Sequence, residues 1–248
     1  GTMCLTESGA GSSVGDNRAK AVPAEDEDGV YLLEGEKIFI SGGDHDLTDN
    51  IMHLVLARLP DAPNGTRGLS IFLVPKFHFD DDGNPGERNG IFVTGIEEKM
   101  GIHASSTCSL VLGADQPCEG ILIGEEGQGM RIMFHMMNQA RMEVGIQGLS
   151  GASMAYEQSV AYAKDRIEGT PIETKMDPDA TPVSIDQHPD VRRMLMWQKV
   201  HVEAMRSFIY TVGLQLDQME HETDPGKQRD LKGQVELMTP IIKSYCSD

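Results

Sequence analysis

The sequence predicts an α+β fold in which an antiparallel β-barrel or sandwich is followed by long antiparallel helices of an incomplete helical bundle. The first half holds short strand-like runs with no helical segment between them, which favours antiparallel pairing. From Gly127 onward the apolar residues change to a helical period. A length of 248 residues is enough for two cores, and we place the domains at residues 1–124 and 125–248.

The first half contains runs of β-branched and large apolar residues, separated by turns rich in Gly, Pro and Asp. The runs are Val30–Leu33, Lys37–Ser41, Ile51–Leu59, Leu69–Pro75, Ile91–Ile96, Ser109–Leu112 and Gly120–Ile123. Between the first two runs, Glu34-Gly35 has the composition of a tight hairpin turn. We therefore expect the chain to reverse direction at that point.

The first predicted helix has an apolar stripe that starts at Met130 and runs towards Arg166. Gly145, Gly148 and Gly151 recur every three residues within it. Each glycine lowers helix stability relative to alanine, and the usual compensation is close approach of another backbone or of a ligand. The methionines at the start of the stripe either line a pliable apolar pocket or pack in the core.

Two further helices are predicted after a loop rich in Gly, Pro and Asp over Glu168–His188. Pro189 suits the first turn of the second helix, because proline there gives up no helical hydrogen bond. The third helix begins near Lys227. Pro240 lies within it and predicts a kink or a break.

Composition narrows the classes of function. Lysine and arginine total 21 against 39 aspartates and glutamates, and the net charge of −18 argues against nucleic acid as a main partner. No apolar run approaches the roughly 20 residues of a membrane span. The four cysteines lack Cys-x-x-Cys spacing, which argues against structural zinc and a disulfide scaffold. We expect a cytoplasmic location and, from the abrupt start and end, a fragment of a longer protein.

Two acidic segments have the residue types of a hard-metal site. Asp44-His45-Asp46 with Asp49 meets no known spacing, so a solvated loop is the simpler interpretation. The segment Asp80–Asn84 begins like a calcium loop, but its sixth position is Pro85 and its twelfth is Ile91, where such a loop needs Gly and Glu. We therefore predict no metal site.

One segment, Thr6–Ser13, combines small residues, glycines and hydroxyls just after a strand-like start. Its backbone amides could approach an anion or a ring system closely. From the residues alone, a ligand loop and an ordinary turn both remain open.

Several segments, taken in order, form a recognisable set. They are Met3–Ser12, Gly35–Gly42, Glu98–Thr107, Gly124–Met130 followed by Met137 and Arg141, and Tyr162–Arg166. The second resembles Gly-x-Lys-x-Trp-Ile-Thr-Asn and the third resembles Lys-x-Gly-x-Arg-x-Ser-x-Thr. Together they resemble the acyl-CoA dehydrogenase family over essentially the whole chain. The likeness is closer to its larger bacterial members, of which the methylthiopropionyl-CoA dehydrogenases are one branch.

The resemblance implies a flavoenzyme that uses FAD. It assigns flavin contacts to the backbone of Leu5 and Thr6, to the Ser12 hydroxyl, and to Phe39, Ile40 and Ser41. Phe39 stands where the family has tryptophan and Ser41 where it has threonine, so an aromatic face and a hydroxyl are kept. The resemblance also implies that Arg166 reaches the FAD pyrophosphate of a neighbouring subunit. Ser12 and Arg141 are its substrate-binding candidates, with Arg141 near the acyl pocket.

The implied reaction is α,β-dehydrogenation of an acyl-CoA thioester: a glutamate removes the α-proton and flavin N5 accepts the β-hydride. We expect the glutamate after Asp248, together with the missing end of the helical bundle, and the amino-terminal helical domain before Gly1. Some relatives place the base just before the equivalent of Arg141, where this chain has Ala140. Glu143 is the remaining candidate within the chain. The implied partners are electron-transfer flavoprotein and further copies in a dimer or tetramer.

The sequence departs from the family pattern at several positions. His103 replaces an arginine, Gly42 replaces an asparagine, and the segment Gly169–His188 is longer than in compact members. Two other functions share the same motifs. One is an acyl-CoA oxidase that passes electrons to oxygen. The other is a flavin-binding stress-response protein of the same fold that performs no dehydrogenation.

Overall fold

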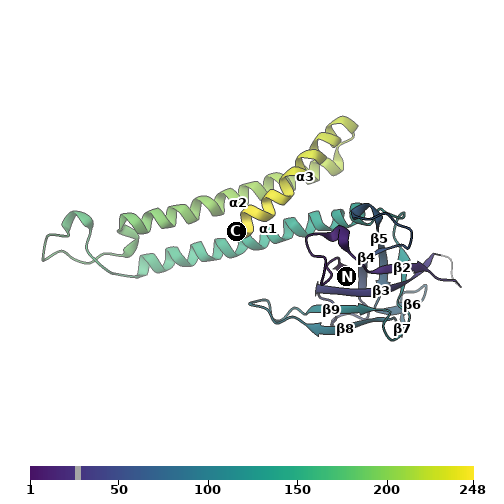
Figure 1. Cartoon of the computed structure of the whole chain (residues 1–248). Helices are drawn as coiled ribbons and strands as arrows, with labels where there is room; N and C mark the ends of the chain where they lie inside the picture. Colours follow the sequence, from purple (N-terminus) through teal and green to yellow (C-terminus); the bar gives the residue numbers. More distant parts are fainter. Residues whose placement is uncertain (26–28) are drawn as a thin grey trace. The chain divides into compact units, whose positions relative to one another are not determined.

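The computed structural model describes residues 1–25 and 29–248. They form two compact units, Gly1–His135 and Met136–Asp248, which we describe separately. Unit 1 is the β-rich part of the chain and unit 2 contains the long helices (Figure 1). The predicted domain boundary after residue 124 stays a prediction.

Unit 1 is built from short strands. They are β1 (Thr2–Cys4), β2 (Lys20–Pro23), β3 (Val30–Ser41), β4 (Met52–Arg58), β5 (Leu69–Pro75), β6 (Phe77–Phe79), β7 (Pro85–Arg88), β8 (Ile91–Ile96), β9 (Thr107–Leu112) and β10 (Glu119–Leu122). The main sheet has the order β1-β4-β5-β10-β3-β9-β8, and β2 pairs with both β3 and β4. This double pairing closes β4, β5, β10, β3 and β2 into a ring, which confirms the predicted barrel.

Most pairs are antiparallel, as expected, but β1 and β2 each pair with β4 in parallel. The predicted reversal at Glu34-Gly35 is wrong, because β3 runs unbroken from Val30 to Ser41. Gly35 has a φ of 144°, and a Cβ there would lie 2.9 Å from the Cα of Ala19. The glycine therefore permits close approach of the chain before β2 and makes no turn.

The core of unit 1 lies inside the barrel. Its buried residues include Leu33 and Ile40 from β3, Val55 from β4, Phe72 from β5 and Leu110 from β9. In β4, β5 and β9 the core residues lie two apart, as a period of two predicts, whereas in β3 a shift of register between Lys37 and Ile40 breaks the alternation. The chain leaves the barrel after β10 through a glycine-rich segment that packs against β5, where the Gly127 amide donates to Ser70 Oγ at 2.9 Å.

Unit 2 consists of most of α1 (Gly129–Asp165), with α2 (Pro189–His221) and α3 (Pro225–Ser247). Figure 1 shows α1 and α2 running antiparallel, with α3 folded back along them. Pro189 and Pro225 occupy the first turns of their helices, and Asp224 caps α3 by accepting a hydrogen bond from the Lys227 amide at 2.9 Å. The predicted order of helices is confirmed.

α3 continues through Pro240, so the break that we considered there is not present. The proline removes one helical hydrogen bond, but Ile242 and Cys246 beyond it are buried in the core of unit 2. That core also contains Val212 of α2 and Val235 of α3, with Met142 of α1 packed against it. Burial of the last turns of α3 offsets the missing bond.

Two of the three repeated glycines in α1 lie against α3. A Cβ on Gly145 would be 2.5 Å from Ile242 Cγ2, and a Cβ on Gly148 would be 2.0 Å from the Cys246 carbonyl oxygen. Gly151 has nothing within 4 Å of the equivalent position. The prediction of close backbone approach is therefore confirmed for Gly148 and wrong for Gly151, whereas the close neighbour of Gly145 is a side chain.

Candidate functional site

The loop after β1 is a tight hairpin held against β3. The Glu7 amide donates to the Ala10 carbonyl at 3.1 Å, and the Ala10 amide donates back to the Glu7 carbonyl at 3.0 Å. The Thr6 carbonyl accepts from the Ile38 amide at 2.9 Å. Segments about 30 residues apart, the first two motifs of the sequence, therefore lie side by side.

A buried ion pair lies beneath this loop, and sequence reasoning missed it. Lys37 has a fully buried side chain, and its Nζ donates to Glu7 Oε1 at 2.8 Å and to the Leu5 carbonyl at 3.1 Å. Burial lowers the pKa of Lys37, while the carboxylate of Glu7 acts in the opposite direction. The signal available in the sequence was a lysine in a strand between the inward-facing Leu33 and Ile40.

Glu7 is satisfied on both carboxylate oxygens. In addition to Lys37, it accepts from the Arg18 amide at 2.6 Å and from the Ala19 amide at 3.0 Å. Hydrogen bonds to a carboxylate are stronger than those between neutral groups. The side chain therefore joins the hairpin to the segment that leads into β2.

β3 carries a bulge at the second motif. The pairing of β3 with β9 shifts register between Lys37 and Ile40, so both of these side chains face the barrel interior. Phe39 between them has a φ of 60°, which is unusual for a residue with a side chain, and the residue is 58% exposed. Ser41 is also exposed, whereas Ile40 is 2% exposed and could offer only its backbone to a ligand.

The third motif lies beside the bulge. The Gly42 amide donates to the Ser106 carbonyl at 2.7 Å, and Ser41 pairs with Thr107. The loop before them exposes the apolar side chains of Met100 and Ile102, of which Ile102 also has a positive φ of 54°. Unit 1 thus gathers three motifs, which are far apart in the sequence, at one end of β3.

Ser12 lies in the exposed stretch that follows Ala10, before the 3₁₀ turn Val14–Asp16. Its hydroxyl has no hydrogen bond to any other described residue. The position is accessible, as a ligand contact requires. The stretch itself has small side chains that leave its backbone uncovered.

The remaining candidates belong to unit 2. Arg166 follows the last turn of α1, and its guanidinium donates Nε and Nη2 to Glu168 Oε2 at 3.0 and 2.9 Å, with both side chains exposed. Glu168 raises the pKa of Arg166 above its usual value. Arg141 is half-buried and donates to Asn138 Oδ1 at 3.1 Å. Glu143 is exposed and accepts from Gln139 Nε2 at 3.1 Å.

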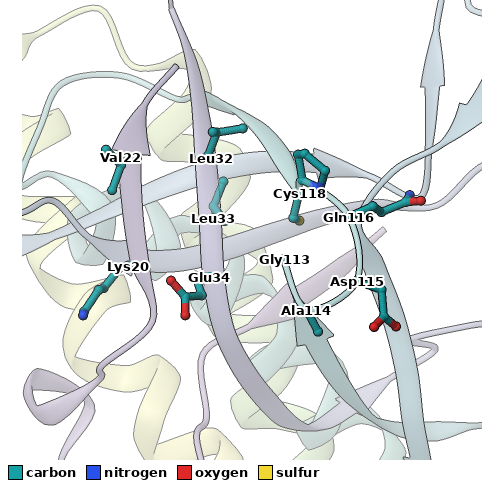
Figure 2. Close-up of a pocket in the computed structure, with 11 residues that line it drawn as sticks. Lys20, Val22, Leu32, Leu33, Glu34, Gly113, Ala114, Asp115, Gln116 and Cys118 are labelled. Carbon is teal, nitrogen blue, oxygen red and sulfur yellow. The ribbon is translucent and has the colours of Figure 1, made fainter. Parts of the chain in front are cut away.

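Two hollows contain none of these candidates. One, of about 460 Å³, is shown in Figure 2 between β2, β3 and Gly113–Cys118. The other, of about 750 Å³, lies in unit 2, where His201 Nδ1 is 2.9 Å from the Tyr245 hydroxyl. The candidate site of unit 1 is therefore an exposed surface.

The two acidic segments form no metal centre in the described part of the chain, where no group of three or more His, Cys, Asp or Glu side chains is placed to hold an ion. Asp80 instead accepts from the amides of Asp82 and Asn84, which closes a local turn. None of the described helices is long and apolar enough to cross a membrane.

Comparison with known proteins decides the family. The sequence model for the acyl-CoA dehydrogenase middle domain matches residues 2–114, and the one for the acyl-CoA dehydrogenase C-terminal domain matches residues 127–238. The chain belongs to the acyl-CoA dehydrogenase family. The middle domain precedes the C-terminal domain along this acyl-CoA dehydrogenase chain, in the order that its motifs predicted.

Named relatives agree with this assignment. The chain is 43% identical to 3-methylmercaptopropionyl-CoA dehydrogenase of Ruegeria pomeroyi over all of its 248 residues. It is 45% identical to the broad-specificity linear acyl-CoA dehydrogenase FadE5 of Mycobacterium tuberculosis. In both cases it is covered completely but spans 41% of the relative's length.

Solved structures of the family share the fold. Caenorhabditis elegans ACDH-11 in complex with C11-CoA has a TM-score of 0.78 at 23% identity, covering 99% of this chain and 37% of that one. Acyl-CoA dehydrogenase complexed with FAD from Bacillus anthracis has a TM-score of 0.69 at 25% identity, covering 98% and 37%. The fold of this chain is thus that of acyl-CoA dehydrogenases.

Proposed function

We propose that this chain is the flavin-facing part of a longer FAD-dependent acyl-CoA dehydrogenase, which introduces a double bond between the α- and β-carbons of an acyl-CoA thioester. The observation that carries the proposal is the meeting of three family motifs at the end of β3. The Thr6 carbonyl is bonded to the Ile38 amide, next to the exposed ring of Phe39, and Gly42 is bonded to Ser106.

The residues of this surface fit a flavin ring. Phe39 offers an exposed aromatic face, and its positive φ is held by the flanking pairs of β3 with β9, so the ring is set before a ligand arrives. Ser41 offers a hydroxyl two residues away, and the Leu5–Thr6 backbone lies beside β3. FAD, when bound, supplies a ring whose N5 accepts the hydride that leaves the β-carbon.

The chain's own residues would bind and orient the cofactor. Ser12 is exposed for a hydrogen bond to cofactor or substrate, and Arg166 is exposed for the pyrophosphate of a neighbouring subunit. Since Arg166 is paired with Glu168, an anion must compete with that carboxylate. We place Arg141 near the acyl group, and the proposal requires a dimer or tetramer.

We place the base that removes the α-proton outside residues 1–248. A thioester α-proton is weakly acidic, so a glutamate in a dry pocket and oriented hydrogen bonds to the developing enolate are needed. Glu143 is exposed and bonded to Gln139, surroundings that do not resemble a dry pocket. Ala140 precedes Arg141, so the alternative base position carries no carboxylate.

The names of the relatives at 42–45% identity support a proposal for the substrate class. Their names specify 3-methylmercaptopropionyl-CoA, butyryl-CoA and linear acyl-CoA. We therefore propose an unbranched acyl-CoA as substrate, electron-transfer flavoprotein as acceptor and a cytoplasmic location. The boundary between the flavin-facing barrel and the helical domain falls, in this proposal, after residue 124.

An anaerobic spectrum of the full-length protein tests this function. We expect a flavin band that straight-chain acyl-CoAs bleach, and a panel of chain lengths identifies the preferred substrate. A flavin band that no thioester bleaches contradicts dehydrogenation and favours the flavin-binding protein without this activity. Fast reoxidation of the bleached enzyme by oxygen, with none by electron-transfer flavoprotein, indicates an oxidase. Absence of a flavin band after FAD is added refutes the proposal.

A further inference from the structure

The buried Glu7–Lys37 ion pair has no part in the function described so far, although burying two charges costs desolvation free energy. Both side chains lie in the interior of unit 1, with 0% and 6% exposure for Lys37 and Glu7. Burying an ion pair loses hydration that its attraction only partly restores, and an apolar pair of similar volume is often as stable. We therefore look for a role of the pair other than stabilising the fold.

Its geometry fixes the direction of one peptide group. The Leu5 carbonyl accepts from Lys37 Nζ at 3.1 Å and from Asn17 Nδ2 at 2.7 Å, so it points towards the buried amine. In a trans peptide the carbonyl and the following N–H point in opposite directions. The Thr6 N–H therefore points away from Lys37, and it has no hydrogen-bond partner among the described residues.

The pair also sets the spacing between the loop and the bulge. Lys37 lies in β3 two residues before Phe39, and Glu7 lies directly after Thr6. The bond from the Ile38 amide to the Thr6 carbonyl, at 2.9 Å, lies between these points. Glu7 is held in turn by the Arg18 and Ala19 amides. The Glu7–Lys37 ion pair and the Ile38–Thr6 hydrogen bond thereby fix the positions of Thr6 and Phe39 relative to each other.

We propose that Glu7 and Lys37 are positioning residues for the cofactor: they aim the Thr6 N–H at an acceptor atom of the flavin ring and hold it in register with Phe39. This inference rests on the proposed function. In this inference the buried Glu7–Lys37 pair orients the Thr6 N–H, and the flavin accepts a hydrogen bond from that N–H at the surface. It differs from a stability role because it predicts that FAD affinity and folding stability can be separated.

The test compares variants of the full-length protein for FAD affinity and for thermal stability. Lys37→Met removes the bond to Leu5, and we expect the Kd for FAD to rise about tenfold, the change that accompanies roughly 1.4 kcal/mol of lost binding free energy. Asn89→Ala is the matched control, because Asn89 is also fully buried in unit 1 but bonds the Pro75 and Glu119 carbonyls. It should lower the Tm with little change in Kd.

The double variant Glu7→Gln/Lys37→Met separates positioning from charge burial. It leaves no unpaired buried charge, so its Tm should recover relative to Lys37→Met. Its Kd for FAD should stay weak, because the Leu5 carbonyl still lacks the lysine bond. Recovery of FAD affinity together with Tm would overturn the inference, since the pair would then act through stability alone.

Residue-resolved hydrogen exchange on the unmodified protein provides a test that needs no variant to fold. The Thr6 amide should exchange quickly after FAD is removed and become protected when FAD is restored. An unprotected Thr6 amide in the FAD-loaded protein refutes the inference. Suppose that the unmodified protein binds FAD, that a thioester bleaches its flavin band, and that Lys37→Met binds FAD equally well. The positioning role is then refuted, while the proposed function stands. If the unmodified protein binds no FAD, both fail.

Discussion

Replacing Gly148 by alanine should destabilise the helical unit, although alanine is the better helix former. A Cβ at this position would lie 2.0 Å from the Cys246 carbonyl oxygen, far short of the 3.4 Å at which ordinary contact begins. The obstacle is backbone, so α1 and α3 must move apart. Overpacking of this kind costs about 3 kcal/mol and the helix propensity of alanine returns about 1 kcal/mol, which leaves a net loss of about 2 kcal/mol.

Gly151→Ala is the matched control in the same helix. Nothing lies within 4 Å of its added Cβ, so the propensity gain of up to about 1 kcal/mol should appear as increased stability. Gly145→Ala should fall between the two, since its added methyl would meet the side chain of Ile242, which can move.

Thermal unfolding of the purified chain, followed by circular dichroism at the helical minimum, measures this series, because the helices dominate that signal. A loss of about 2 kcal/mol corresponds to a Tm lower by roughly 4–8 °C for a chain of this size. The reasoning is refuted if Gly148→Ala is as stable as the unmodified chain, or if Gly148→Ala and Gly151→Ala shift the Tm in the same direction.

Three further predictions concern unit 1. Burial lowers the pKa of His53 to about 4, so the stability from keeping it neutral is full above about pH 6.5 and is lost as the pH falls towards 4, by about 3 kcal/mol. Urea unfolding across this range should show that slope, and His53→Asn should flatten it. Phe39→Gly relieves a positive φ and should raise the Tm by a few degrees while FAD dissociates more readily, whereas an unchanged FAD off-rate contradicts the stacking role. Ser41→Val should lower the flavin occupancy of the full-length protein, and unchanged occupancy would show that the residue assignments on β3 are wrong.

Much of the fold could be predicted from local pattern. Leu69–Pro75 and Ile91–Ile96 were predicted with the bounds that the structure has, and the helix starting at Pro189 was as expected. The errors arose where tertiary contacts overrule local preference. Glu34-Gly35 has the composition of a turn, but the glycine is needed for contact with Ala19.

The residues of the candidate site were proposed from the sequence, and their contacts with a flavin stay a prediction. The motifs pointed to Thr6, Phe39 and Ser41, because the order of residue types along the chain can be compared with the family pattern. They could not reveal the bulge that exposes Phe39 and buries Ile40, since a bulge depends on the register of β3 against β9. Nor could they reveal that Lys37 reaches back over 30 residues to Glu7.

The sequence by itself determined that strands precede long helices, the excess of negative charge and the family motifs, because periodicity, composition and motif order are properties of neighbouring residues. Only the tertiary structure decided which segments meet: β2 closing the barrel between β3 and β4, Gly148 against Cys246, and the buried lysine beneath the loop. Such contacts depend on the closure of long loops and on burial, and neither is encoded in any short stretch of chain.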